Sequence, residues 1–281
     1  MGRVIHTEIY ESLTEMVDAA LKPAAAGVRR ISRERGDRKW YGTPNFDAAV
    51  RLAQEGWSGP RKQVQSTVTE VMDAVGSDDS WSTVGPQMAY DVTGGAPDVG
   101  LFMTGEPECM VNFIVANERP SVRIMASASY LSAVRAEHVL ARGAVISALV
   151  EALHAAGVGV ELWGCLSTRN EGGEIADMFV RVKSYEDPLD MDQVMFVFAH
   201  PSFARRIGFG AKETLPRHVA WSQHYGLNRR SYGRSCSPGD LSPIGEFDLV
   251  IGPNQGEGDP IVRDPIGWVR DTIKQLKGEA G

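Results

Sequence analysis

The chain has 281 residues, of which 43% are hydrophobic and 23% charged, and its formal net charge is -7 at pH 7. This composition is typical of a soluble globular protein built as one large domain, or as one domain with an elaborated N-terminal layer. It argues against a membrane-spanning chain, because no window approaches the ~18 consecutive apolar residues that a bilayer requires, and the acidic balance opposes long-range attraction to nucleic acid.

The first 80 residues carry mostly helical patterns. Apolar residues at spacings of three and four predict a helix within Thr7–Leu21. A stretch of basic residues at 29–39 has no periodicity and is expected to form an exposed loop or a frayed helix. Asn45 is placed to cap a helix that ends at Gly56, and a further helix is predicted over Arg61–Val75.

The middle of the chain is irregular. Strands are predicted over Gln87–Val92 and around Val111–Ala116. Between them, Thr93–Asp98 form a turn that leads to one helical turn around Val99–Met103. We therefore interpret residues 1–120 as a mostly helical and irregular N-terminal region that packs on a core domain.

From residue 121 the pattern becomes regular. A strand over Val122–Ala126 leads to a long apolar helix over Arg135–Ala156. Two strands, Val158–Leu166 and Ile175–Val182, are joined by a glycine-containing loop that suits a hairpin. The later predicted elements are a helix capped by Asp190, its continuation over Ala204–Thr214, a strand over Phe247–Ile251 and a helix from Asp264 to Lys277. Residues 121–281 are thus expected to form a Rossmann-like α/β core, with a mixed sheet flanked by helices.

One antiparallel hairpin inside an otherwise parallel order resembles the von Willebrand A fold. The family's metal motif, Asp-x-Ser-x-Ser, corresponds here to residues 125–129, which read Met-Ala-Ser-Ala-Ser. Ser127 and Ser129 match the motif, whereas Met125 replaces the aspartate, and a thioether is no ligand for Mg²⁺. The resemblance therefore implies a degenerate motif that holds neither a metal nor a cofactor. An alternative interpretation is that the two serines cap the following helix.

Several segments spread over nearly the whole chain resemble an uncharacterised protein family associated with bacteriophages and prophages. They are Trp40–Pro44, Gly105–Met110, Ser127–Ser129, Arg142–Gly157 and Ala199–Ile207. The resemblance implies a mobile-element origin and no assigned activity. We accordingly expect the protein in the host cytoplasm or associated with the virion.

Known catalytic and metal-binding motifs are missing from the sequence. None of the six histidines belongs to an HExxH pair, and no GxSxG elbow or glycine-rich phosphate loop is found. The cysteines, Cys109, Cys165 and Cys236, have no CxxC spacing, which indicates neither a disulfide framework nor a zinc site. These observations favour a protein without enzymatic activity.

Basic residues are concentrated in two stretches, residues 29–39 and 205–234. The end of the second stretch interleaves cations with aromatic rings. Its candidate contact residues are Arg217, Trp221, Tyr225, Arg229, Arg230, Tyr232 and Arg234. Cations that contact phosphates and rings that stack on bases suit single-stranded nucleic acid, whereas an exposed loop or an arginine-rich protein contact has the same composition.

The missing motifs and the altered serine motif together favour a non-enzymatic protein-binding module. We expect a scaffold or regulatory partner of a phage or host protein, with no membrane association. The alternative is a nucleic-acid-binding regulator that uses the basic and aromatic segment 217–234.

Overall fold

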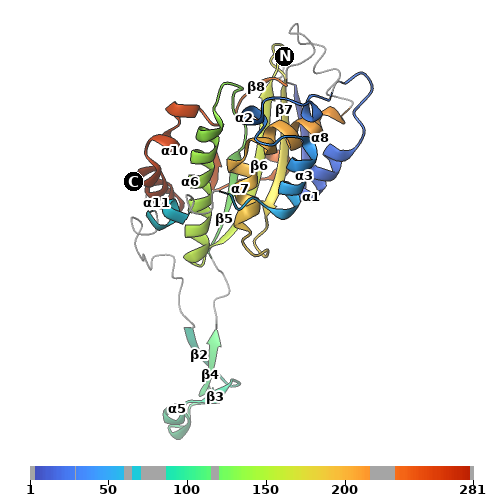
Figure 1. The fold of residues 1–281 in the computed structure, drawn as a ribbon. Coiled ribbons are helices and arrows are strands. Elements are labelled where there is room, and N and C mark those ends of the chain that lie inside the picture. The colour runs from blue at the N-terminus through green and yellow to red at the C-terminus, as the bar shows by residue number, and fades with distance from the viewer. Residues whose placement is uncertain are drawn as a thin grey trace.

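A computed structural model describes residues 4–28, 30–59, 65–70, 87–114, 120–215 and 232–278. Its central sheet has the strand order β1-β7-β6-β5-β9, with β8 paired to β6 (Figure 1). The strands are β1 (Ile5–Tyr10), β5 (Ser121–Ser127), β6 (Gly159–Arg169), β7 (Ile175–Lys183), β8 (Arg234–Ser235) and β9 (Leu249–Ile251). β5 runs parallel to β6 and β9, β7 is antiparallel to β6, and β1 is parallel to β7. This mixed, mostly parallel sheet with covering helices confirms the predicted Rossmann-like α/β class.

Helices pack against the sheet to form the main core. They are α1 (Leu13–Leu21), α3 (Phe46–Glu55), α6 (Ala136–Ala155), α7 (Met191–Ala199), α8 (Phe209–Glu213), α10 (Pro260–Arg263) and α11 (Pro265–Leu276), together with α2 (Arg38–Tyr41) and a π-helical turn at Phe203–Gly208. The close packing of α6 on α7 depends on Gly143, where a Cβ atom would lie 2.4 Å from the Cα atom of Ala199. The opposite face of the sheet carries a smaller cluster, in which Trp163 and Phe179 are covered by Ile244.

The helix α6 is long and apolar enough to cross a membrane by length and composition alone. Its side chains, however, are mostly buried in the core that it shares with the sheet. The left-handed Gly157, with φ +80°, follows its C-terminus, as the sequence predicted. Burial inside the fold explains the apolar surface of α6 without a membrane.

The predicted helix within Thr7–Leu21 is wrong in its first part. Residues 5–10 form β1 at the edge of the sheet, in register with β7 from Ile5↔Ile175 onward. The Ser12 hydroxyl then accepts the N–H of Glu15 at 3.1 Å and starts α1. Pairing with a distant strand satisfies the backbone groups that a helix would satisfy locally, so tertiary context overrides the helical spacing. The predicted boundary at residue 120 separates an N-terminal region from the core. Because β1 joins the same sheet as β5, the N-terminal region nevertheless contributes a strand to that core.

Several other N-terminal predictions can be compared with the structure. Asn45 caps α3, since its Oδ1 atom accepts the N–H of Ala48 at 2.8 Å, and this prediction is confirmed. The expected loop at 29–39 contains a 3-10 turn at Ile31–Arg33 followed by α2, while Arg29 lies outside the described residues. Of the helix predicted over Arg61–Val75, the structure describes residues 65–70, which are helical.

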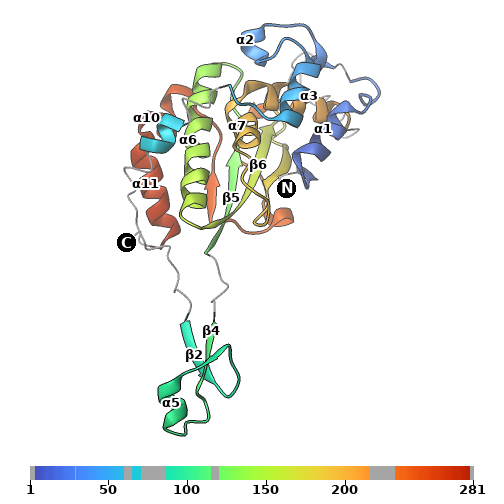
Figure 2. The ribbon, with the colours of Figure 1, turned by 60° about the horizontal axis from the view of Figure 1, so that its bottom comes forward.

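Residues 87–114 form a separate three-stranded sheet that we call the arm. Its elements are β2 (Gln87–Asp91), β3 (Ala96–Pro97), α5 (Val99–Met103) and β4 (Met110–Ile114), with β4 between two antiparallel neighbours. Both ribbon views show the arm standing away from the body of the molecule (Figures 1 and 2). The predicted strands and helical turn of this region are confirmed over the described residues, whereas residues 115 and 116 of the second predicted strand lie outside them.

Candidate functional site

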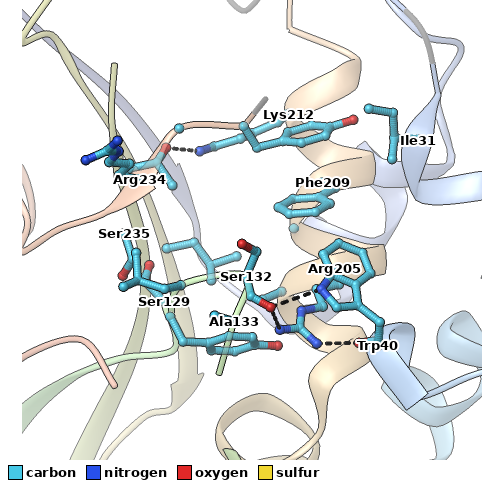
Figure 3. Close-up of a pocket in the computed structure, with 18 residues that line it drawn as sticks. Ile31, Trp40, Ser129, Ser132, Ala133, Arg205, Phe209, Lys212, Arg234 and Ser235 are labelled. Atoms are coloured by element: carbon cyan, nitrogen blue, oxygen red, sulfur yellow. Dashed lines mark hydrogen bonds between the residues drawn. The ribbon is translucent and has the colours of Figure 1, made fainter. Parts of the chain in front are cut away.

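A cavity of about 600 Å³ lies beyond the carboxyl ends of β5 and β6 (Figure 3). The loop that follows β5, the end of β6, the strand β8 and the helical segment 204–212 form its walls, and Trp40 closes one side. Ligands of α/β proteins commonly bind outside the carboxyl ends of the strands, because the loops and helix termini there converge. This cavity is therefore the candidate site.

A buried ion pair lies beyond the carboxyl ends of β5 and β9. The Nε atom of Arg142 lies 3.1 Å from the Asp259 carboxylate, and each side chain is 3% exposed. Arg142 also donates to the carbonyl of Ser127 at 2.8 Å and to that of Gly252, which ties together the ends of the two strands. The chain reverses its direction of winding between these strands, where doubly wound folds often bind ligands. Here Arg142 and Asp259 occupy that position.

Ser127 and Ser129 lie at the end of β5, where the sequence places them. The Ser127 hydroxyl accepts the N–H of Ser129 at 3.2 Å, and the Ser129 hydroxyl accepts the N–H of Ser167 at 2.7 Å. Neither caps α6, whose N-cap residue is Arg135 without a side-chain cap. The capping interpretation is wrong because the intervening loop separates both serines from the helix. Ser129 instead lines the cavity.

The part of the chain that the structure describes contains no group of three His, Cys, Asp or Glu residues arranged to hold a metal ion. Asp248 accepts the N–H of Arg123 at 2.7 Å, near the amino end of β5 and far along the strand from Ser127. Asp177 lies at the cavity end of β7, but its carboxylate accepts the N–H of Gly239 at 2.8 Å. Neither carboxylate takes the place of the aspartate that Met125 replaces.

Lys212 brings a buried amine to the cavity wall. Its side chain is on α8, the residue is 4% exposed, and its Nζ atom donates to the hydroxyl of Thr168. Burial lowers the pKa of Lys212 to about 8, and the nearby Asp177 carboxylate offsets part of this effect. Lys212 is therefore mostly protonated at pH 7, yet it titrates within an accessible pH range.

Arg205 contributes a second buried cation. Its guanidinium lies 4.4 Å from the ring centre of Trp40 and 4.7 Å from that of Tyr130. Its Nη atoms donate to the carbonyls of Trp40 and Val134, the latter at 3.1 Å. Carbonyls and ring faces stabilise the charge without neutralising it, so Arg205 adds positive potential to the cavity.

Aromatic rings form the wall opposite Ser129 (Figure 3). Phe209 and Tyr232 are stacked with ring centres 3.9 Å apart and planes 6° from parallel. Trp40 lies 6.3 Å from Phe209 at a tilt of 40°. The Tyr232 hydroxyl donates to the buried carboxylate of Glu213, which fixes the position of the Tyr232 ring.

Ser235 supplies an unsatisfied polar atom. It lies on β8 beside Arg234, and both residues line the cavity. The Ser235 hydroxyl is buried and has no hydrogen-bond partner among the described residues. Buried polar atoms nearly always have partners, so this hydroxyl has capacity to bind a ligand.

The predicted basic and aromatic segment can be located only at its end. Tyr232 and Arg234 are described, and both line the cavity. The remaining candidates, Arg217, Trp221, Tyr225, Arg229 and Arg230, lie outside the described residues. Sequence reasoning did not identify Trp40, Arg205 or Lys212 as residues of one site. The only sequence signal of Arg205 and Lys212 was a positive charge within a predicted helix, and that of Trp40 was an aromatic ring beside a basic stretch.

A family model described as a domain of unknown function, DUF7192, matches residues 3–279. Comparison of the chain with curated proteins and with solved structures gave no match. These findings support neither a phage origin nor a relation to von Willebrand A domains, and both resemblances stay predictions.

Proposed function

The chain belongs to the DUF7192 family of unknown function, and we propose from its geometry that it is a binding module whose cavity receives a small anion carrying an aromatic ring. A nucleotide is the model ligand. The observation that carries this proposal is the composition of the residues that line the cavity. It combines three cations, four aromatic rings and no carboxylate among the described lining residues: Arg205, Lys212, Arg234, Trp40, Tyr130, Phe209 and Tyr232.

The cations make the cavity suitable for an anion although the protein as a whole is acidic. Lys212 and Arg205 are buried at the wall, where low polarity strengthens their attraction for a negative charge. Arg234 is exposed and can meet the anion as it enters. No described carboxylate lines the cavity, so an incoming phosphate or carboxylate meets like charge only from behind the wall, where Asp177 interacts with Lys212.

The rings make the same cavity suitable for a planar group. Trp40 and Phe209 present aromatic surface on the wall opposite Ser129 and Ser235. Stacking of a base on an aromatic side chain contributes about 1–3 kcal/mol and tolerates different bases. The hydroxyls of Ser129 and Ser235 can then bind polar edges of the ligand.

Calorimetric titration of the intact protein with a nucleoside monophosphate tests this proposal. The nucleoside alone and inorganic phosphate serve as the two half-ligands. We expect the monophosphate to bind at least about tenfold more tightly than either half, because ring and anion contacts contribute together. Failure of the monophosphate to bind, or equal affinity for inorganic phosphate, would refute it.

Matched variants locate the binding site. Arg234→Ala and Lys212→Met each remove a cation from the cavity and should weaken the monophosphate about tenfold. Lys274→Ala removes an exposed cation on α11, outside the cavity lining, and should leave the affinity unchanged. Circular dichroism verifies that each variant is folded.

The second candidate is the protein-binding module of phage or prophage origin, acting in the host cytoplasm or on the virion. The observation that favours it is the arm, where Val99, Phe102 and Met103 are 69%, 65% and 77% exposed. Neighbouring apolar side chains exposed to this extent commonly mark interaction sites. Pull-down experiments with the intact chain and with a Phe102→Ser, Met103→Ser variant test this candidate, and equal recovery of partners by both proteins contradicts it.

A nucleic-acid-binding regulator remains a proposal that depends on residues outside the described ranges. It predicts oligonucleotide binding that weakens steeply as salt rises. Absence of binding to single- and double-stranded oligonucleotides at low ionic strength would contradict it.

A further inference from the structure

The arm combines exposed apolar side chains with charge of one sign. Residues 87–114 contain Asp91, Asp98, Glu106 and Glu108, and no Lys, Arg or His. Phe102 and Met103 project from α5, a helix in which no residue is buried. The arm therefore presents an acidic surface around an apolar tip.

The described side chains of the arm bury almost no apolar surface among themselves. Among its described side chains, residues 90–112, only Cys109 is buried. Its local order depends on backbone pairing and on Asp98, which caps α5 through the N–H of Gly100 at 2.9 Å. A small sheet without a buried apolar face is marginally stable in water. A surface that covers the apolar tip would supply the missing burial.

The body carries a surface of the opposite charge. In residues 33–39, which we call the basic segment, Arg33, Arg35, Arg38 and Lys39 are exposed, with Asp37 as the exposed acid among them. Apolar groups border this segment. Trp40 is partly exposed and its indole N–H donates to the carbonyl of Ser132 at 3.2 Å, while the neighbouring Leu131 is 50% exposed.

The two surfaces of one molecule are far apart. Figure 2 shows the helix α2, which contains Arg38 and Lys39, at the end of the body opposite to the arm. Among the described residues, the complementary basic and apolar surface within reach of an arm is therefore that of another copy. A head-to-tail contact of this kind is heterologous, so it can build open chains or rings.

We propose that the arm of one molecule docks on the basic segment of a second copy of this chain. Opposite charges set the orientation, and Phe102 and Met103 of the arm pack beside Trp40 and Leu131 of the next molecule. The inference rests on the second candidate function, protein binding through the arm, and names its partner. Trp40 and Leu131 also line the cavity, so docking and ligand binding share these two residues, but neither proposal requires the other.

Sedimentation velocity of the intact protein over a range of concentrations provides the first test. We expect the average mass to rise with concentration and to fall when the ionic strength is raised, because exposed charges are screened beyond about 10 Å at 0.1 M salt. A protein that stays monomeric at every concentration and at low salt overturns the inference. If that monomer still recovers another protein through its arm, the protein-binding function stands and only its assigned partner is wrong.

A charge exchange provides the decisive test. Variant one, Glu106→Lys with Glu108→Lys, gives the arm positive charge, and variant two, Arg35→Glu with Arg38→Glu, gives the basic segment negative charge. All four residues are exposed, so both variants should fold. Each alone should associate at least about tenfold more weakly than the natural chain, because like charges face each other.

Mixing the two variants should restore association. The lysine-bearing arm of variant one then meets the glutamate-bearing segment of variant two, and the two unaltered surfaces also match. A Phe102→Ser, Met103→Ser protein, which keeps all charges, should lose self-association, and mixing it with variant one should not restore it. Mixing it with variant two should give only a one-to-one pair, because the intact arm of variant two meets the unaltered basic segment of the serine variant. Unchanged association of the single variants, or no recovery on mixing, refutes docking between these surfaces.

Discussion

The body and the arm distribute charged and apolar side chains in opposite ways. The body buries Arg142, Arg205, Arg206 and Lys212, each of which is held by carbonyls, hydroxyls, rings or a carboxylate. The arm exposes Phe102 and Met103 and buries almost nothing that is described. The body thus pairs its buried charged groups with partners inside the fold, whereas apolar side chains of the arm stay exposed to water. This difference indicates that the body is stabilised by its own packing, and it agrees with the proposal that a second copy covers the arm.

Removing a buried cation from the body is expected to have the largest effect. Arg206 is fully buried and donates to the carbonyls of Ser32 and Glu34, at 2.6 and 2.8 Å, from within the core. Arg206→Met should lower the free energy of unfolding by about 4 kcal/mol, because these acceptors lose their donor. Arg35→Met, at an exposed position, should change it by less than about 0.5 kcal/mol. Urea unfolding measures both free energies. Equal effects of the two substitutions would show that burial of Arg206 contributes nothing special to the stability of the body.

The second prediction concerns the acid sensitivity of the body. His200 packs with its ring centre 4.4 Å from Trp57 and its Nδ1 atom 2.6 Å from the Ser202 hydroxyl. Burial lowers the pKa of His200 from 6.5 to about 4, so the folded state keeps this ring neutral. Between these two pH values the unfolded state binds the additional proton. Stability present above pH 6.5 should therefore decline by up to about 3 kcal/mol as the pH falls to about 4.

The variant His200→Asn tests that assignment because asparagine keeps an acceptor for Ser202 and does not titrate. Its free energy of unfolding should depend less on pH between 6.5 and 4 than that of the natural protein. Identical pH profiles would show that other groups cause the acid sensitivity.

The third prediction concerns the cavity. Because the pKa of Lys212 is about 8, raising the pH from 7 to 9 removes the ammonium charge from the wall. Affinity for an anionic ligand should fall roughly tenfold over this range, as the ligand binds the protonated form. Lys212→Arg should keep the affinity and lose the pH dependence. A natural protein whose affinity does not change with pH would exclude Lys212 from anion binding.

The smallest effect is expected in the arm. Phe102→Ser with Met103→Ser should change the unfolding free energy of the monomer by less than about 0.5 kcal/mol, because both side chains are already in water. Measurements on dilute protein at high salt isolate the monomer. A loss of several kcal/mol there would mean that these side chains pack within the molecule, and the contrast between arm and body would fail.

Local patterns predicted much of the fold. The β6–β7 hairpin could be predicted because two apolar strands flank a glycine-containing loop, and α6 could be predicted because its apolar positions continue until Gly157. The strand β1 was missed because its partner is the distant β7. Spacing along a chain reports the neighbours of a residue within one element and carries no signal for pairing over such a separation.

The candidate site was harder to predict from the sequence than the fold. Trp40, Ser129, Lys212 and Tyr232 come from four separate parts of the chain and meet only when the sheet and helices are assembled. Arg205 and Arg206 lie in a predicted helix within a basic stretch, and nothing in that pattern indicated that they are buried. The π-helical turn at Phe203–Gly208 instead turns both side chains inward, where carbonyls and rings receive them.

The position of β1 also affects how the chain folds as it leaves the ribosome. β1 is made first, yet its partner β7 begins only at Ile175, so the edge of the sheet cannot be completed until most of the chain has been synthesised. Until then, β5, β6 and β7 can assemble from a contiguous stretch, while β7 keeps an unpaired edge. An open edge can pair with another chain. Pairing with β1 therefore covers the edge of β7 late in synthesis, and β1 then becomes the outer strand of the finished sheet.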